Sequence, residues 1–82
     1  MNPEEKIISI ISRNIEQKQA VTLDQELVAD LGMDSLSVMM VVQALEDEFQ
    51  ISINDDDFKG LKTVRDVVGK LRATYPAIDG AQ

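Results

Sequence analysis

The stretch LGMDSLSVMMVVQALEDEF, residues 31–49, predicts a helix that begins abruptly and buries one apolar face. Gly32 interrupts the chain, and Asp34 with Ser35 stands where short polar side chains usually cap a helix N-terminus. At about 100° per residue, five apolar side chains share one stripe, namely Val38, Val41, Val42, Leu45 and Phe49. We therefore expect a helix over residues 35–49 that packs this stripe into a core and displays Ser35 at its start.

The other side of this predicted helix combines apolar and acidic side chains. Leu36 and Met40 lie opposite the buried stripe, and Met39 lies on one flank. Single exposed apolar residues are normal, but a cluster beside a displayed serine is typical of a docking surface. This interpretation assigns a set of residues to contacts with partner proteins: Asp34, Leu36, Met39, Met40, Gln43, Glu46 and Asp47.

Two further main helices are predicted on either side of this stretch. Residues 3–16 follow Asn2, a possible N-cap, and repeat isoleucine at helical spacing at positions 7, 8, 11 and 15. Thr63 and Asp66 form a capping-box pattern that opens the last helix, and Pro76 ends it.

The remaining segments are predicted as connections. Residues 50–53 alternate like a strand but have no partner strand, so we expect an extended loop there, followed by a short helical turn at 55–59. The chain is thus predicted to be all-α, a small four-helix bundle with three main helices and one short helix. It forms one domain over residues 1–76, with a flexible tail over 77–82. Residues 18–33 are expected to reach the core through Val21, Leu23, Leu27 and Leu31.

Charge and composition narrow the class of protein. Fifteen acidic against eight basic residues give a net charge of −7. Phosphate backbones and anionic membranes would repel this chain, whereas basic patches on partner proteins would attract it. No segment reaches transmembrane length, and residues 1–5 lack the layout of a signal peptide. We expect a cytoplasmic monomer that neither binds nucleic acid nor inserts into membranes.

Few side chains in this sequence can carry chemistry. The 82 residues include no His and no Cys. This excludes a disulfide framework, a thiolate metal site and a histidine base for Ser35. A serine that is displayed but not activated is interpreted as a residue that another protein modifies. We therefore expect no enzyme activity and no metal site.

Residues 31–36 resemble the modification motif of the acyl carrier proteins, Leu-Gly-x-Asp-Ser-Leu, whose serine carries 4′-phosphopantetheine. Residues 44–49, Ala-Leu-Glu-Asp-Glu-Phe, look like the family's Ala-Leu-Glu-Glu-Glu-Phe run at the end of the second helix. Ile51 and Ile53, and then residues 63–67, fit the family's later helices. The likeness extends from about residue 7 to residue 71.

This resemblance implies a cofactor, a cargo and partners. A phosphopantetheinyl transferase, with its own Mg²⁺ and base, would attach 4′-phosphopantetheine to Ser35, and the thiol of the arm would hold an acyl group as a thioester. Acyl-transferring and synthase enzymes of fatty acid, lipid or polyketide biosynthesis would bind the carrier through basic docking patches. A helix N-terminus suits the phosphodiester, whereas Asp30 and Asp34 oppose it electrostatically. In the family, acyl chains often enter a cavity between the helices.

Three positions after the serine depart from the pattern of fatty-acid-synthesis carriers. The second and fifth positions, usually acidic in that group, are Ser37 and Met40, and the eighth, often Met, is Gln43. The outward face has therefore lost two negative charges and gained an apolar side chain near Ser35. Ordinary enzymes of fatty acid synthesis read this face through basic residues, so we predict a specialised carrier of a dedicated pathway.

Other interpretations stay open. A peptidyl carrier of non-ribosomal synthesis shares the arm but usually shows Gly-Gly-x-Ser in place of Gly-Met-Asp-Ser. A plain helical interaction domain would use Ser35 only as a cap. Calcium binding would need an EF-hand-like loop, although Lys59 and Lys62 occupy two of its positions. Its ligand and turn residues would be Asp55, Asp57, Gly60 and Asp66.

Overall fold

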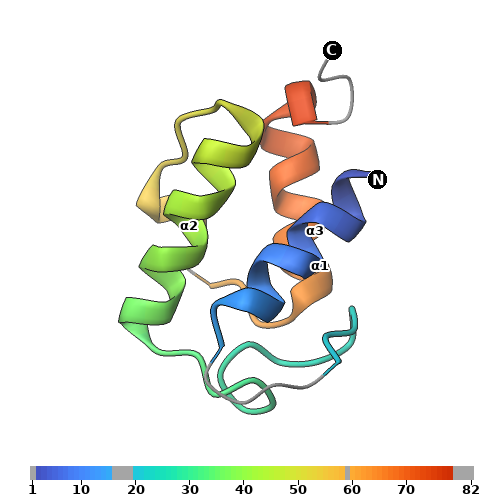
Figure 1. Cartoon of the computed structure of the whole chain (residues 1–82), viewed down its shortest axis with the longest axis vertical. Coiled ribbons are helices and arrows are strands. Elements are labelled where there is room, and N and C mark those ends of the chain that lie inside the picture. The colour runs from blue at the N-terminus through green and yellow to red at the C-terminus, as the bar shows by residue number, and fades with distance from the viewer. Residues whose placement is uncertain (1, 16–19, 59, 79–82) are drawn as a thin grey trace.

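The computed structural model describes residues 2–15, 20–58 and 60–78 of the chain. Within these ranges the chain forms α-helices and short 3-10 helices but no strand (Figure 1). In order they are α1 (Pro3–Arg13), α2 (Ser35–Phe49), η1 (Asp55–Phe58), α3 (Val64–Thr74) and η2 (Pro76–Ile78). The predicted all-α bundle is confirmed. None of the described helices is both long and apolar enough to cross a membrane.

The core forms where α1 contacts both α2 and α3. No polar or charged residue among those described is buried, so burial of aliphatic side chains is the main source of stability. Ile10, which the predicted stripe of the first helix omits, is buried, whereas Ile8 is half-buried. The most deeply buried side chains are Ile7, Ile10, Ile11, Val41, Leu45, Val64, Val67 and Leu71.

The first turn of α2 lies at one end of the bundle (Figure 1). In that view α2 begins at the lower left, whereas α1 begins at the upper right and η2 lies at the top. The start of α1 and the end of the described chain are therefore far from the helix start that carries Ser35.

Helix α1 is shorter than the sequence predicts, although its cap at Asn2 is confirmed. Asn14 ends it, because the Asn14 Nδ2 donates to the Ile10 carbonyl at 2.8 Å and the Asn14 N–H donates to the Ile11 carbonyl at 3.0 Å. The predicted continuation of the helix through residue 15 is wrong. Glu16, the predicted last residue, lies outside the described residues.

Helix α2 begins and ends at the predicted residues, 35 and 49. Four of the five residues in the predicted stripe are buried, and Val38 at its edge is half-buried. Gln50 closes the helix in a left-handed conformation, with a φ of 56°.

The loop and short turn after α2 also follow the prediction. Residues 50–53 run without helical or strand structure, and Ile53 is buried. Asn54 caps η1, since its Oδ1 accepts a hydrogen bond from the Asp56 N–H at 3.0 Å. The turn ends at Phe58, and Lys59 lies outside the described residues.

Helix α3 opens with the predicted capping box, in which the Thr63 and Asp66 side chains each accept a hydrogen bond from the other's backbone. It ends before Pro76, as predicted, but the fold continues beyond it. In η2 the Ile78 side chain is 3% exposed and belongs to the core. The domain therefore extends past the expected boundary at residue 76, and residues 79–82 lie outside the described part.

Candidate functional site

Ser35 is the exposed first residue of α2, and its neighbour Asp34 is the residue that caps the helix. The Asp34 Oδ1 accepts a hydrogen bond from the Ser37 N–H at 2.9 Å. This bond favours the ionised carboxylate and so lowers the pKa of Asp34. None of the described residues forms a hydrogen bond with the Ser35 side chain. The Ser35 hydroxyl is thus accessible and has no capping role.

A tight turn just before α2 fixes where Ser35 lies. Leu31 and Met33 are both buried, on either side of Gly32. The Met33 N–H donates to the Leu27 carbonyl at 3.0 Å and closes the turn. Gly32 has a φ of 68°, a left-handed conformation that glycine adopts without the steric cost of a Cβ. The chain therefore passes from the core at Met33 to the surface at Ser35 within two residues.

Backbone hydrogen bonds tie the connection before this turn to the start of α3. The Leu27 N–H donates to the Lys62 carbonyl at 2.9 Å, and the Val64 N–H donates to the Gln25 carbonyl at 3.0 Å. These bonds join segments that are far apart in the sequence, so local periodicity gives no sign of them.

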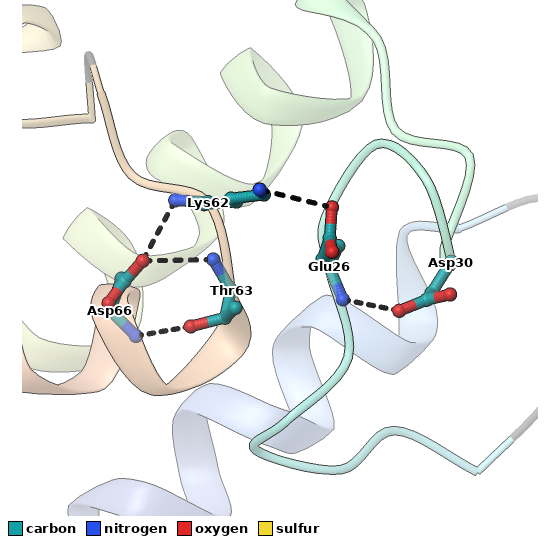
Figure 2. Close-up of polar contacts among 5 residues, drawn as sticks. All are labelled: Glu26, Asp30, Lys62, Thr63 and Asp66. Carbon is teal, nitrogen blue, oxygen red and sulfur yellow. Dashed lines mark hydrogen bonds and ion pairs between the residues drawn. The ribbon is translucent and has the colours of Figure 1, made fainter.

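Figure 2 shows the charged side chains that border this junction. The Asp66 Oδ2 accepts the N–H groups of Lys62 and Thr63 at 3.0 and 3.1 Å, and these bonds lower the pKa of Asp66. The Lys62 Nζ lies 4.0 Å from the Glu26 Oε1. Asp30 accepts the Glu26 N–H at 2.7 Å. The Asp30 carboxylate, expected to oppose a phosphate at Ser35, is thus engaged within its own loop.

An apolar pocket of about 620 Å³ opens beside Ser35. Asp34 and Ser35 contribute the polar part of its lining. Sequence reasoning missed Val28 and Phe58, because they come from the preceding turn and from η1 and reach the pocket only through folding. The apolar lining consists of Val28, Met33, Val38, Met39, Val42 and Phe58.

All but one of the predicted contact residues are exposed. Leu36 and Met39 are 65% and 63% exposed, which is high for large apolar side chains. Glu46 differs from the others, because it is half-buried and its Oε2 accepts the Ile53 N–H at 2.7 Å. Glu46 therefore holds the loop after α2, a role that the sequence pattern did not indicate.

The structure distributes these contact residues over two sides of Ser35. Met39 lines the apolar pocket together with Ser35. Leu36 and Met40 line a second hollow of about 300 Å³, which Arg13 at the end of α1 also borders. Their contact with partners stays a prediction.

Two carboxylates of the calcium-binding alternative have partners within the fold. Asp57 accepts a hydrogen bond from the Tyr75 hydroxyl, and Asp66 belongs to the capping box of α3. In the part of the chain that the structure describes, no three His, Cys, Asp or Glu side chains are grouped to hold a metal ion.

Known proteins share both the sequence pattern and the fold. The family described as "Phosphopantetheine attachment site" matches residues 5–71. An acyl carrier protein of Exiguobacterium sibiricum is 52% identical over 52 residues, which cover 63% of this chain and 66% of that protein. An acyl carrier protein of Syntrophobacter fumaroxidans is 40% identical over 63 residues, which cover 76% of this chain and 78% of that protein.

The fold itself matches a solved structure described as "a putative acyl carrier protein" from Mycobacterium tuberculosis. The TM-score is 0.78 at 38% identity, and the match covers 89% of this chain and 99% of that one. Acyl carrier proteins are non-catalytic carriers of phosphopantetheine that interact with phosphopantetheinyl transferases and synthase enzymes. Because the family match spans residues 5–71 and the helical bundle agrees, this chain belongs to the acyl carrier protein family.

Proposed function

We propose that Ser35 is the attachment point of 4′-phosphopantetheine and that the protein presents acyl thioesters to the enzymes of a dedicated lipid or polyketide pathway. One observation carries this proposal: the Ser35 hydroxyl is exposed at the start of α2, has no capping role, and borders an apolar pocket. A transferase can reach such a hydroxyl without disturbing the helix, because Asp34 provides the cap.

The surroundings of Ser35 fit a phosphodiester on a mobile arm. The positive end of the α2 dipole favours an anion at this position. The adjacent Asp34 carboxylate repels the anion, so the phosphate is directed away from Asp34. When bound, the arm supplies a thiol, which the chain itself lacks because it contains no Cys.

The pocket beside Ser35 supports an apolar cargo. Its lining is aliphatic and aromatic apart from Asp34 and Ser35. A volume of about 620 Å³ is in the range of small-molecule sites in proteins. We expect an acyl chain to shelter there from water, because burying apolar surface is favourable.

The face around Ser35 supports a specialised pathway. The positions at which fatty-acid-synthesis carriers usually have acids are Ser37 and Met40, and Met40 is 47% exposed. Leu36 and Met39 add exposed apolar area on the same helix. A partner that fits this face would bury apolar contacts near Ser35 and place its basic residues elsewhere. We place this carrier in the cytoplasm. The net charge of −7 supports a monomer, because like charges repel one another.

The attachment is tested by intact mass. After incubation with coenzyme A and a broad-specificity phosphopantetheinyl transferase, the wild type should gain one phosphopantetheine. Ser35→Ala should gain none and keep its helical circular dichroism. Ser37→Ala, which removes a hydroxyl one position beyond Leu36, should load like the wild type. Loading of Ser35→Ala, or no loading of the wild type by several transferases, would contradict the proposal.

The specialisation is tested by restoring a charge. Loaded Met40→Glu should be acylated faster than the wild type by the enzymes of a housekeeping fatty acid synthase, because it regains an acid that those enzymes read. Gln43→Glu adds the same charge at an exposed position outside the pocket, where the family pattern often has Met, and is the matched control. Equal acylation of wild type and Met40→Glu would refute a dedicated pathway.

A further inference from the structure

The chain contains one tyrosine, Tyr75, directly after α3. Its hydroxyl oxygen accepts a hydrogen bond from the Asn54 N–H at 3.2 Å. The same hydroxyl donates to the Asp57 carboxylate. Tyr75 therefore holds both the residue that precedes η1 and a residue within it.

The turn that Tyr75 holds is a closed unit. Asn54 caps it twice, since its Oδ1 accepts the Asp56 N–H at 3.0 Å and its carbonyl accepts the Asp57 N–H at 2.9 Å. Phe58 follows Asp57 directly and lines the pocket beside Ser35. A displacement of the turn would therefore displace one wall of the pocket.

A four-residue 3-10 helix has little stability of its own. Before the turn, the Glu46 carboxylate holds the Ile53 N–H at 2.7 Å. After the turn, the Leu61 N–H lies 3.5 Å from the Phe58 carbonyl, a weak bond. The Tyr75 hydroxyl fastens the turn itself to the end of α3.

We propose that Tyr75 is a positioning residue for the acyl cargo: its hydroxyl fastens η1 to the end of α3 and so keeps Phe58 in place as a wall of the pocket beside Ser35. This inference rests on the proposed function, because the wall matters to cargo only if an arm on Ser35 brings an acyl chain to it. Tyr75→Phe removes the hydroxyl and keeps the ring that packs against the core.

The first measurement uses the unmodified protein. In Tyr75→Phe the Asn54 and Asp57 amides should exchange with deuterium about five to thirty times faster than in the wild type, because one or two net hydrogen bonds no longer oppose local opening. The Val41 amide in the middle of α2 should keep its rate. Thr74→Val, which removes the neighbouring exposed hydroxyl, is the matched control. Unchanged exchange at Asn54 and Asp57 would overturn the proposal.

A second variant checks which bond matters. Asp57→Ala removes the acceptor of the Tyr75 proton but leaves the bond from the Asn54 N–H, so it should accelerate exchange less than Tyr75→Phe. The bond to Asp57 also raises the pKa of Tyr75, to which the nearby Glu46 charge adds. Absorbance titration of this sole tyrosine should therefore show a lower midpoint in Asp57→Ala. An unchanged midpoint would count against the link.

The deciding measurement uses protein whose Ser35 carries a phosphopantetheine arm, with either an acetyl or an octanoyl group as a thioester on its thiol. Hydroxylamine should release the octanoyl group about three times faster from Tyr75→Phe than from the wild type, because the pocket shelters the thioester less well. Acetyl release should be equal, since that chain is too short to use the pocket. Equal octanoyl rates would overturn the positioning role even if exchange is faster. Failure of wild-type Ser35 to load would instead overturn the proposed function, and the cargo role with it.

Discussion

The two ends of α2 differ in what their side chains do. At the N-terminal end the first turn has no acidic residue, and the large apolar side chains on its outer face are exposed. At the C-terminal end Glu46 holds the loop that follows. There the Lys6 Nζ also lies 3.5 Å from the Glu48 Oε2 and 5.8 Å from the centre of the Phe49 ring.

The N-terminal end of α2 presents exposed apolar side chains to the surroundings, whereas the C-terminal end contributes to the stability of the fold. The acidic residues at the C-terminal end partly hold the protein together, although an exposed ion pair such as that of Lys6 contributes little on its own. At the N-terminal end Ser35, Leu36 and Met39 are exposed, so their side chains are available to other proteins. Substitutions at the two ends should therefore fail in different assays.

The largest contrast is expected between two leucines of this helix. Leu45 is fully buried, so Leu45→Ala should lower the free energy of unfolding by about 3 kcal/mol. Leu36 is 65% exposed, and Leu36→Ala should lower it by less than about 0.5 kcal/mol. Urea unfolding followed by circular dichroism measures both. Similar losses for the two variants would remove the contrast.

Two neighbouring acids at the C-terminal end sharpen the comparison. Glu46→Ala leaves the half-buried Ile53 N–H without its acceptor and should lower the free energy of unfolding by about 1.5 kcal/mol. Asp47→Ala removes a similar charge from the exposed side of the same turn and should change it by less than about 0.5 kcal/mol. If Asp47→Ala costs as much as Glu46→Ala, the effect comes from charge and not from the bond to Ile53.

The left-handed residues that flank α2 allow a smaller test. Gly32 has a φ of 68°, so Gly32→Ala should lower the free energy of unfolding by about 1 kcal/mol through backbone strain. Gln50 has a φ of 56° at the other end, so Gln50→Gly should raise the free energy of unfolding by relieving backbone strain. The gain should be only about 0.5 kcal/mol, because the side-chain hydrogen bond from Gln50 to the Asp47 carbonyl is lost. Thermal unfolding of both variants measures these shifts. A higher melting temperature for Gly32→Ala than for the wild type would contradict the expected backbone strain.

The cap at the N-terminal end predicts a pH dependence. The Ser37 N–H lowers the pKa of Asp34 in the folded state below its value in the unfolded chain. The contribution of Asp34 to stability is therefore present above the unfolded value and is lost as pH falls through the folded one. Asp34→Asn keeps an acceptor but does not titrate, so its melting temperature should fall less than that of the wild type between about pH 5 and pH 2. If the melting temperatures of the two proteins fall equally with pH, the cap does not depend on the charge of Asp34.

Local sequence patterns predicted the parts of the fold that depend on near neighbours. The bounds of α2 follow from the Asp34 cap and from one apolar stripe, and the start of α3 follows from Thr63 and Asp66, three positions apart. Helix α1 was predicted too long, because the pattern of isoleucines continues to Ile15 while Asn14 bonds the last turn and ends the helix.

Features built from distant segments could not be predicted in this way. The pocket beside Ser35 depends on Val28 and Phe58, which no shared motif connects. The link from Tyr75 to η1 also joins two separate elements. Glu46 was assigned to the partner surface, since helical periodicity gives the direction of a side chain but not the hydrogen bond that bends it back to Ile53.

The start of α2 and the described ends of the chain lie on opposite sides of the bundle (Figure 1). A tag, an anchor or a further domain could therefore be attached before α1 or after η2. It would lie on the side of the bundle away from Ser35 and would not block a partner enzyme that approaches this serine. Ser35 therefore stays open to partner enzymes whether the domain is free in solution or fused to other domains at its described ends.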